Sequence, residues 1–214
     1  MTATRILDLL FPVVGQRLPT DHGYLLYGAL SRTLPCVHDG SVPFSLAPIT
    51  GQYVGNGLIQ LDTQRSHLRL RLAETDIRRL LPLAGKGLQL MRHNIRLGVP
   101  QVRALEPSPS LYARTVAIKR ATDVASVCAA ARRQLDEIKI GGRVRVPDHV
   151  VKGGSVEPQR RVLRIREAII VGYALLVEGL TDEESLRLQE LGLGGRRRMG
   201  CGFFVPAHEE EDAQ

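Results

Sequence analysis

One order of predicted strands and helices occurs twice along this 214-residue chain, and this repetition limits the folds it can adopt. In the first half, apolar patterning predicts a strand, a helix that starts at Pro19-Thr-Asp21, two strands, a short helix and a final strand. The expected ranges are 6–14, 19–34, 58–61, 68–72, 75–81 and 87–97. The two middle strands read as a hairpin, and Leu68-Arg-Leu-Arg-Leu72 alternates with leucine inward and arginine outward.

The second half repeats this order after a proline-rich connection at 98–110. Strands are expected at 111–118, 144–146, 162–165, 168–177 and 201–206, with helices at 122–135 and from the capping box Thr181–Glu184 to Gly192. Strand–helix–strand–strand–helix–strand is the order of a ferredoxin-like unit. The sequence therefore predicts an α+β protein with two tandem ferredoxin-like (RRM-like) domains, 1–100 and 110–207, and an acidic disordered tail at 208–214.

The charge of the chain indicates a polyanionic partner. Its 29 Lys and Arg outnumber its 22 Asp and Glu, which gives a net charge of +7 and favours nucleic acid or an acidic membrane surface. Aromatic residues make up only 4%, which argues against a stacking platform for RNA. The three cysteines are widely spaced and the longest apolar run is too short to span a bilayer. We expect a cytoplasmic protein without a membrane, metal or other cofactor.

A glycine-rich segment precedes the last predicted strand. It reads Gly192-Leu-Gly-Gly-Arg-Arg-Arg-Met-Gly-Cys-Gly202, so its glycines can take positive φ angles and turn backbone amides outward as a nest for anions. Arginines in such a loop would add fork-shaped contacts to phosphate. The segment is neither a Walker loop nor a dinucleotide fingerprint. An alternative interpretation is a helix C-cap followed by a solvated basic turn. The RNA-binding candidates here are Gly192, Gly194, Gly195, Arg196, Arg197, Arg198, Gly200 and Gly202.

Several predicted strands also carry arginines on what we expect to be an outward face. They are Arg69, Arg71, Arg143, Arg145, Arg161, Arg164 and Arg166. Such a face is either merely solvated or a track for a nucleic-acid backbone, and both interpretations stay open. We include Arg143 and Arg145 among the RNA-binding candidates.

Two ferredoxin-like units that end in this glycine segment resemble the CRISPR-associated repeat-processing endoribonucleases of the repeat-associated protein superfamily. A second match is the helix after Leu18-Pro19, followed by Val37-His38-Asp39 and Pro43-Phe44-Ser45. The resemblance covers essentially the whole chain. It implies metal-independent cutting of CRISPR precursor RNA within each repeat, often with retention of the product, and it places the family's catalytic histidine at His38. The family's tyrosine position falls near Ser31, and no lysine lies between His38 and Lys86.

Metal-free RNA cleavage needs a base, an acid and positive charge near the phosphate, while the ribose 2′-OH attacks and leaves a 2′,3′-cyclic phosphate and a 5′-OH. The catalytic candidates are His38, His22 in the first turn of the first helix, Ser31, and Arg32 in place of the missing lysine. For His22, an ordinary polar residue at a helix start is the alternative. The rival function is a non-catalytic RNA-binding subunit of a CRISPR effector complex, whose other subunits would then be partners. The repeat, the cut position and the choice between monomer and homodimer stay open.

Overall fold

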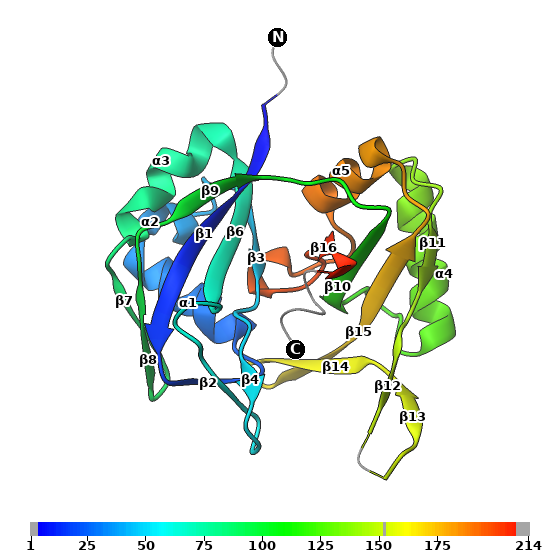
Figure 1. Cartoon of the computed structure of the whole chain (residues 1–214), viewed down its shortest axis with the longest axis horizontal. Coiled ribbons are helices and arrows are strands. Elements are labelled where there is room, and N and C mark those ends of the chain that lie inside the picture. The colour runs from blue at the N-terminus through cyan, green and yellow to red at the C-terminus, as the bar shows by residue number, and fades with distance from the viewer. Residues whose placement is uncertain (1–3, 152, 209–214) are drawn as a thin grey trace. The chain divides into compact units, whose positions relative to one another are not determined.

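The computed structural model describes residues 4–151 and 153–208, which form two compact units (Figure 1). The first unit contains residues 4–105 together with 198–200. The second contains 106–151, 153–197 and 201–208. Residues 209–214, most of the predicted acidic tail, lie outside the described residues. Each unit has a hydrophobic core of its own. None of the described helices is both long and apolar enough to cross a membrane.

The first unit is built on an antiparallel sheet with the strand order β3-β6-β1-β8-β7, in which β9 also pairs with β1. Its strands are β1 (Ile6–Gly15), β3 (Phe44–Ala47), β6 (His67–Ala73), β7 (Gly87–Leu90), β8 (His93–Leu97) and β9 (Gln101–Ala104). The helices are α1 (Gly23–Thr33), α2 (Pro35–His38) and α3 (Ile77–Leu80), the last flanked by 3-10 turns at Glu74–Asp76 and Leu81–Leu83. With α1 and α3 as the two crossovers, β1, β3, β6 and β8 give the predicted ferredoxin-like topology.

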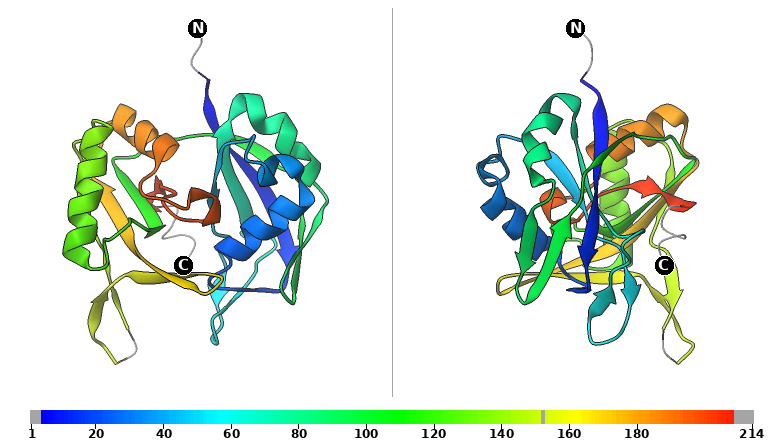
Figure 2. Two further views of the ribbon diagram at one scale, coloured as in Figure 1. Left: turned by 180° about the vertical axis from the view of Figure 1, so that it is seen from behind. Right: turned by 60° about the vertical axis from the view of Figure 1, so that its left-hand side comes forward.

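The core of this unit follows the predicted periodicities. Leu68, Leu70 and Leu72 of β6 are buried, and Leu26 and Leu30 of α1 meet them from the helical layer. Figure 2 shows α1 (blue) and α3 (teal) on the same face of the sheet. Burying one face of the sheet under two helices is the usual solution for an α+β unit.

Three local predictions for this unit are wrong. The segments 58–61 and 68–72 do not form a hairpin, because β5 (Leu58–Gln60) joins a separate small sheet with β2 (Arg17–Pro19) and β4 (Gln52–Tyr53). A polar turn separates them, in which the Asp62 carboxylate accepts the amide of Gln64 at 2.8 Å. The predicted strand 87–97 is split into β7 and β8 by a turn where Met91 has a φ of 54°. The connection 98–110 contains a further strand, β9.

Arg71 does not point into solvent as predicted. It is 3% exposed and lies directly opposite Asp8 of β1, which is 5% exposed. Its Nε and Nη2 donate to the two carboxylate oxygens of Asp8 at 2.7 and 2.9 Å. This bidentate geometry satisfies both charges inside the protein, so Arg71 belongs to the structure of the first unit rather than to an exposed basic face.

The second unit repeats the topology with the strand order β11-β15-β10-β16 and with β14 also paired to β15. Its strands are β10 (Ser110–Val116), β11 (Arg143–Arg145), β14 (Arg160–Ile165), β15 (Ala168–Glu178) and β16 (Val205–Pro206), and β12 (Asp148–Val150) and β13 (Val156–Pro158) form a separate hairpin. The helices are α4 (Val124–Glu137) and α5 (Asp182–Leu191), which cover one face of the sheet (Figure 1).

Both helices of the second unit start at capping boxes. Asp123 and Ser126 cap α4, and Thr181 and Glu184 cap α5 as predicted from the sequence. The final strand is shorter than the predicted range 201–206, because β16 contains only Val205–Pro206. Arg166 is also not a strand residue. It lies with positive φ in the turn that joins β14 to β15.

Candidate active site

His38 is the last residue of the short helix α2. Pro35 occupies the first turn of this helix, and Val37, 1% exposed, anchors it in the core of the first unit. His38 itself is exposed. Within the described part of the chain its imidazole makes no hydrogen bond or ion pair. Both ring nitrogens are therefore available to a ligand.

The loop after His38 is held by polar contacts. The Asp39 carboxylate accepts the backbone amide of Ser41 at 2.7 Å. Arg79, at the end of α3, donates to the Ser41 carbonyl oxygen at 2.8 Å and to the Ser41 hydroxyl. The hydrogen bonds from Ser41, and more weakly the charges of Arg79 and His38, lower the pKa of Asp39 below its ordinary value. Asp39 therefore stays anionic beside His38, and the loop has a defined path.

Arg198 lies over this loop. The first unit includes Arg198–Gly200, and a Cβ added to Gly40 would lie 3.2 and 3.3 Å from the Nη1 and Nη2 atoms of Arg198. Gly40, with a φ of 74°, thus leaves room for a guanidinium two residues after His38. The same segment packs tightly elsewhere, because a Cβ at Gly23 would overlap the Met199 carbonyl oxygen. The structure therefore brings a cation to the His38 loop.

His22 is placed very differently from His38. It is 1% exposed, its Nδ1 lies 2.7 Å from the carbonyl oxygen of Pro19, and its Nε2 accepts the amide of Ile49 at 2.9 Å. A carbonyl can only accept, so Nδ1 carries the proton and the ring is neutral. Both nitrogens are used to join the start of α1 to the end of β3. This geometry favours the structural alternative over proton transfer to RNA.

Ser31 and Arg32 are not well placed for catalysis either, because the first is inaccessible and the second already has a partner. The Ser31 hydroxyl is buried and has no hydrogen-bond partner among the described residues. Arg32 is exposed, but its Nη2 donates to the Gln89 carbonyl oxygen of β7 at 3.1 Å. Tyr27 of α1 packs against the hydrophobic core.

Four glycines of the glycine segment use their backbone amides within the protein. The amides of Gly192, Gly194, Gly195 and Gly202 donate to Leu188 O, Gln134 Oε1, Ala117 O and Thr115 O at 2.8, 2.8, 3.1 and 2.7 Å. The predicted anion nest of backbone amides is therefore wrong for these four residues. The arginine side chains of the segment are therefore its main source of positive charge for a phosphate.

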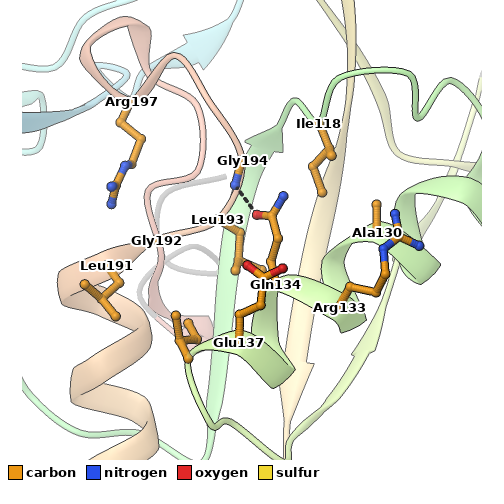
Figure 3. Close-up of a pocket in the computed structure, with 11 residues that line it drawn as sticks. Ile118, Ala130, Arg133, Gln134, Glu137, Leu191, Gly192, Leu193, Gly194 and Arg197 are labelled. Carbon is orange, nitrogen blue, oxygen red and sulfur yellow. Dashed lines mark hydrogen bonds between the residues drawn. The ribbon is translucent and has the colours of Figure 1, made fainter.

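The glycines nevertheless have steric reasons to be there. Gly194 has a φ of 70°, and a Cβ on it would lie 2.6 Å from the Ala117 carbonyl oxygen. A Cβ on Gly202 would overlap the Leu193 carbonyl oxygen. Figure 3 shows Gln134 of α4 directed at the Gly194 amide. Gly195 differs, because an added Cβ would meet nothing within 4 Å. The path of the segment thus requires glycine at 194 and 202 but not at 195.

The three arginines of the segment have different surroundings. Arg196 is exposed and has a φ of 60°, an uncommon conformation for a non-glycine residue. Arg197 starts a 3-10 turn and is partly buried, and burial lowers the pKa of its guanidinium. Arg198 belongs to the first unit. The sequence grouped these residues by adjacency, whereas the structure separates their environments.

Arg143 and Arg145 of β11 share one carboxylate. Their guanidinium groups lie 3.2 and 3.0 Å from Glu178 of β15, and the hydrogen bond from Arg145 is the main cause of the lowered pKa of Glu178. Arg143 remains largely exposed, with 78% of its side chain accessible. One anion faces two cations, which leaves net positive charge at this strand.

In residues 4–151 and 153–208, no cluster of three His, Cys, Asp or Glu side chains is placed to hold a metal ion.

Known proteins resemble this chain in sequence and in fold. The family model described as Cas6 Crispr matches residues 7–209. This chain belongs to the Cas6 family. It is 42% identical over 199 residues to the CRISPR-associated endonuclease Cas6 of Myxococcus xanthus (strain DK1622), covering 93% of this chain and 80% of that protein. The resemblance stated from the sequence is confirmed.

Solved structures of Cas6 proteins have the same fold. One described as CRISPR associated protein Cas6 aligns with a TM-score of 0.65 and 9% identity, over 95% of this chain and all of that one. A Cas6-related protein of Pyrococcus furiosus aligns with a TM-score of 0.63 at 9% identity, over 93% and 97% of the two chains. At such low identity these likenesses concern the fold alone, and they confirm the tandem ferredoxin-like architecture.

Two features of the site were missed from the sequence. Arg198 was assigned to RNA binding only, although it lies against the loop of the catalytic candidate. Arg79 was not considered, although it holds Ser41 in that loop. Neither had a local signal, because the contacts join segments 158 and 38 positions apart in the sequence. A glycine at position 40, directly after His38-Asp39, was the sequence feature that could have indicated a close approach by another segment.

Proposed function

We propose that this Cas6-family protein is an endoribonuclease that cuts CRISPR precursor RNA within each repeat, without a metal ion. The observation that carries the proposal is an exposed His38 on a loop where the Arg198 guanidinium lies against Gly40, two residues further along the chain. The family and the curated relative named as a CRISPR-associated endonuclease support the substrate and the reaction class.

In the proposed reaction, the ribose 2′-oxygen attacks the adjacent phosphorus and the bond from phosphorus to the 5′-oxygen breaks. His38 serves as the proton-transfer group, either taking the 2′-OH proton or protonating the departing 5′-oxygen. Arg198 stabilises the negative charge that develops on the phosphate oxygens. Asp39 stays anionic and helps to fix the loop that carries His38. The products are a 2′,3′-cyclic phosphate and a 5′-OH, and the protein retains the processed RNA through its arginines.

A single 2′-deoxy nucleotide immediately upstream of the cut tests this reaction. We expect repeat RNA with this substitution to bind with unchanged affinity and not to be cut, since the internal nucleophile is gone. Excess EDTA should leave the cleavage rate of unmodified RNA unchanged. Cleavage of the deoxy RNA at the normal site, or full inhibition by EDTA, would falsify the mechanism. Binding of unmodified repeat RNA without any discrete cut would instead favour a non-catalytic RNA-binding subunit.

A further inference from the structure

The second unit contains a pocket between α4 and the start of the glycine segment (Figure 3). Its volume is about 590 Å³, which is large enough for a nucleotide. One wall is a single face of α4, where Ala130, Arg133, Gln134 and Glu137 follow the spacing i, i+3, i+4, i+7. Leu193 and Arg197 of the glycine segment also line it. The pocket is distinct from the His38 loop, which belongs to the first unit.

Arg197 supplies an unsatisfied positive charge. It is partly buried and makes no hydrogen bond or ion pair with the residues that the structure describes. Its guanidinium lies close to Gly192, since a Cβ there would be 3.3 Å from Nη1. A desolvated guanidinium without a partner favours an incoming anion, and a phosphate matches its fork of donors.

Glu137 makes a purely anionic ligand unsuitable. Its carboxylate lines the same pocket and forms no ion pair within the described chain, even with Arg133 four residues earlier on α4. A carboxylate can only accept hydrogen bonds and repels phosphate. A suitable ligand therefore presents hydrogen-bond donors to Glu137 as well as a negative charge to Arg197.

Gln134 and the apolar wall complete the pattern. Gln134 Oε1 accepts the Gly194 amide at 2.8 Å, which orients the side chain and leaves Nε2 as a donor. Ile118 and the exposed Leu191 provide apolar surface for a flat ring. Among the RNA bases, guanine presents two adjacent N–H donors, at N1 and N2, beside the O6 acceptor. A carboxylate next to an amide donor is complementary to that edge.

We propose that this pocket binds one unpaired guanosine nucleotide of the RNA. Glu137 accepts the N1–H and N2–H of the base, Gln134 Nε2 donates to O6, and Arg197 binds the phosphate. This assignment rests on the proposed function in that RNA is the ligand, and it makes Glu137 a specificity residue of the second unit.

The test uses repeat RNA in which inosine, which lacks the N2 amino group, replaces each guanosine in turn. A 2′-deoxy nucleotide at the cut keeps the RNA intact, so that only affinity is measured. At one position we expect inosine to weaken binding to the wild-type protein about fivefold or more. Glu137→Ala and the isosteric Glu137→Gln should abolish that difference. Glu190→Ala, an exposed glutamate of α5 outside the pocket, removes the same charge and should preserve it.

Equal inosine penalties in wild-type and Glu137→Ala at every position would overturn the proposal. Titration with free 5′-GMP separates the two sources of guanosine. Micromolar binding of 5′-GMP that depends on Glu137, without any inosine effect in RNA, would replace RNA by a free nucleotide and also overturn it. Affinity is measured on uncut RNA, so this test does not depend on cleavage. If the inosine effect depends on Glu137 but the protein never cuts RNA, the nuclease assignment is wrong and the guanosine pocket is still supported.

Discussion

The two units share one topology but use their polar side chains differently. In the first unit, Asp8 and Arg71 satisfy each other inside the protein and His22 gives both ring nitrogens to the backbone. In the second unit, Arg143 and Arg145 share one partly exposed carboxylate and Arg197 has no partner in the described chain. The same fold therefore does not give equivalent polar residues the same role. A polar side chain whose hydrogen bonds and charge are satisfied inside the protein is structural, and one without such partners can bind a ligand.

His38 is the informative exception in the first unit. It is a polar side chain on a well-held loop, and yet its own nitrogens stay without a partner in the described residues. The comparison thus predicts that chemistry is concentrated in the first unit and that the second contributes mainly affinity. Four predictions, in order of decreasing expected effect, can break or sharpen this division.

The largest effect is expected for His38→Ala. Loss of general acid–base help should reduce the single-turnover cleavage rate by roughly 10²–10⁴ and leave RNA affinity nearly unchanged. The double variant Arg143→Ala and Arg145→Ala should do the reverse, weakening binding while saturating RNA is still cut at the wild-type rate. If His38→Ala cuts at the normal rate, the first unit does not supply the proton-transfer group proposed here.

Asp8→Ala should give the next largest effect, on stability. It removes the carboxylate that forms a bidentate ion pair with the buried Arg71, and breaking a buried ion pair typically costs about 3–5 kcal/mol of unfolding free energy. Glu178→Ala removes the matching surface carboxylate of the second unit and should cost less than about 1 kcal/mol. Urea denaturation of both variants measures the contrast. Equal losses would show that burial does not distinguish the two ion pairs.

Gly194→Ala should cost less, about 1–3 kcal/mol, because it puts a side chain at a φ of 70° and against the Ala117 carbonyl oxygen. Gly195→Ala is the matched control. Its added Cβ meets open space, so stability should stay within about 0.5 kcal/mol of the wild type. Thermal melts of the two variants suffice. A destabilised Gly195→Ala would contradict the path described for the segment.

The smallest effect concerns pH and Glu178. Arg145 and Arg143 lower the pKa of this carboxyl, so the folded state binds its proton less readily than the unfolded state does. Its contribution is therefore present above the ordinary value of 4.5 and is lost as the pH falls through the lower folded-state pKa. The stability difference between the wild type and Glu178→Gln should be below about 1 kcal/mol at pH 7 and should shrink toward pH 3. A difference that grows on acidification would contradict this sign.

Local patterns in the sequence predicted much of the fold. The inward leucines of 68–72, the leucines of α1 and the capping box at Thr181–Glu184 all depend on neighbours a few residues away, and each is confirmed. The turn at Met91 was missed because it carries no glycine, asparagine or proline. The exposed edge strand β9 was missed because it buries no side chain and so lacks an apolar alternation.

The site was less predictable because its contacts are distant in the sequence. Arg71 was assigned to the surface because its partner Asp8 lies 63 residues earlier. The roles of His22 and Arg198 likewise depend on Ile49 and Gly40, which no periodicity relates to them. Sequence patterns indicated which residues could do chemistry. Burial and hydrogen bonding in the structure then showed which of these side chains are used to hold the fold together and which can reach a ligand.

The place of Arg198–Gly200 within the first unit has a consequence for synthesis of the protein. Domains generally fold as they leave the ribosome, N-terminal part first. Here the nascent first unit lacks three of its residues until almost the whole chain has been made, and it cannot cover Gly23 and Gly40 before then. A chain released early would carry His38 without Arg198. Translation as far as Arg198 is therefore a condition for bringing together the two groups that the proposed reaction uses.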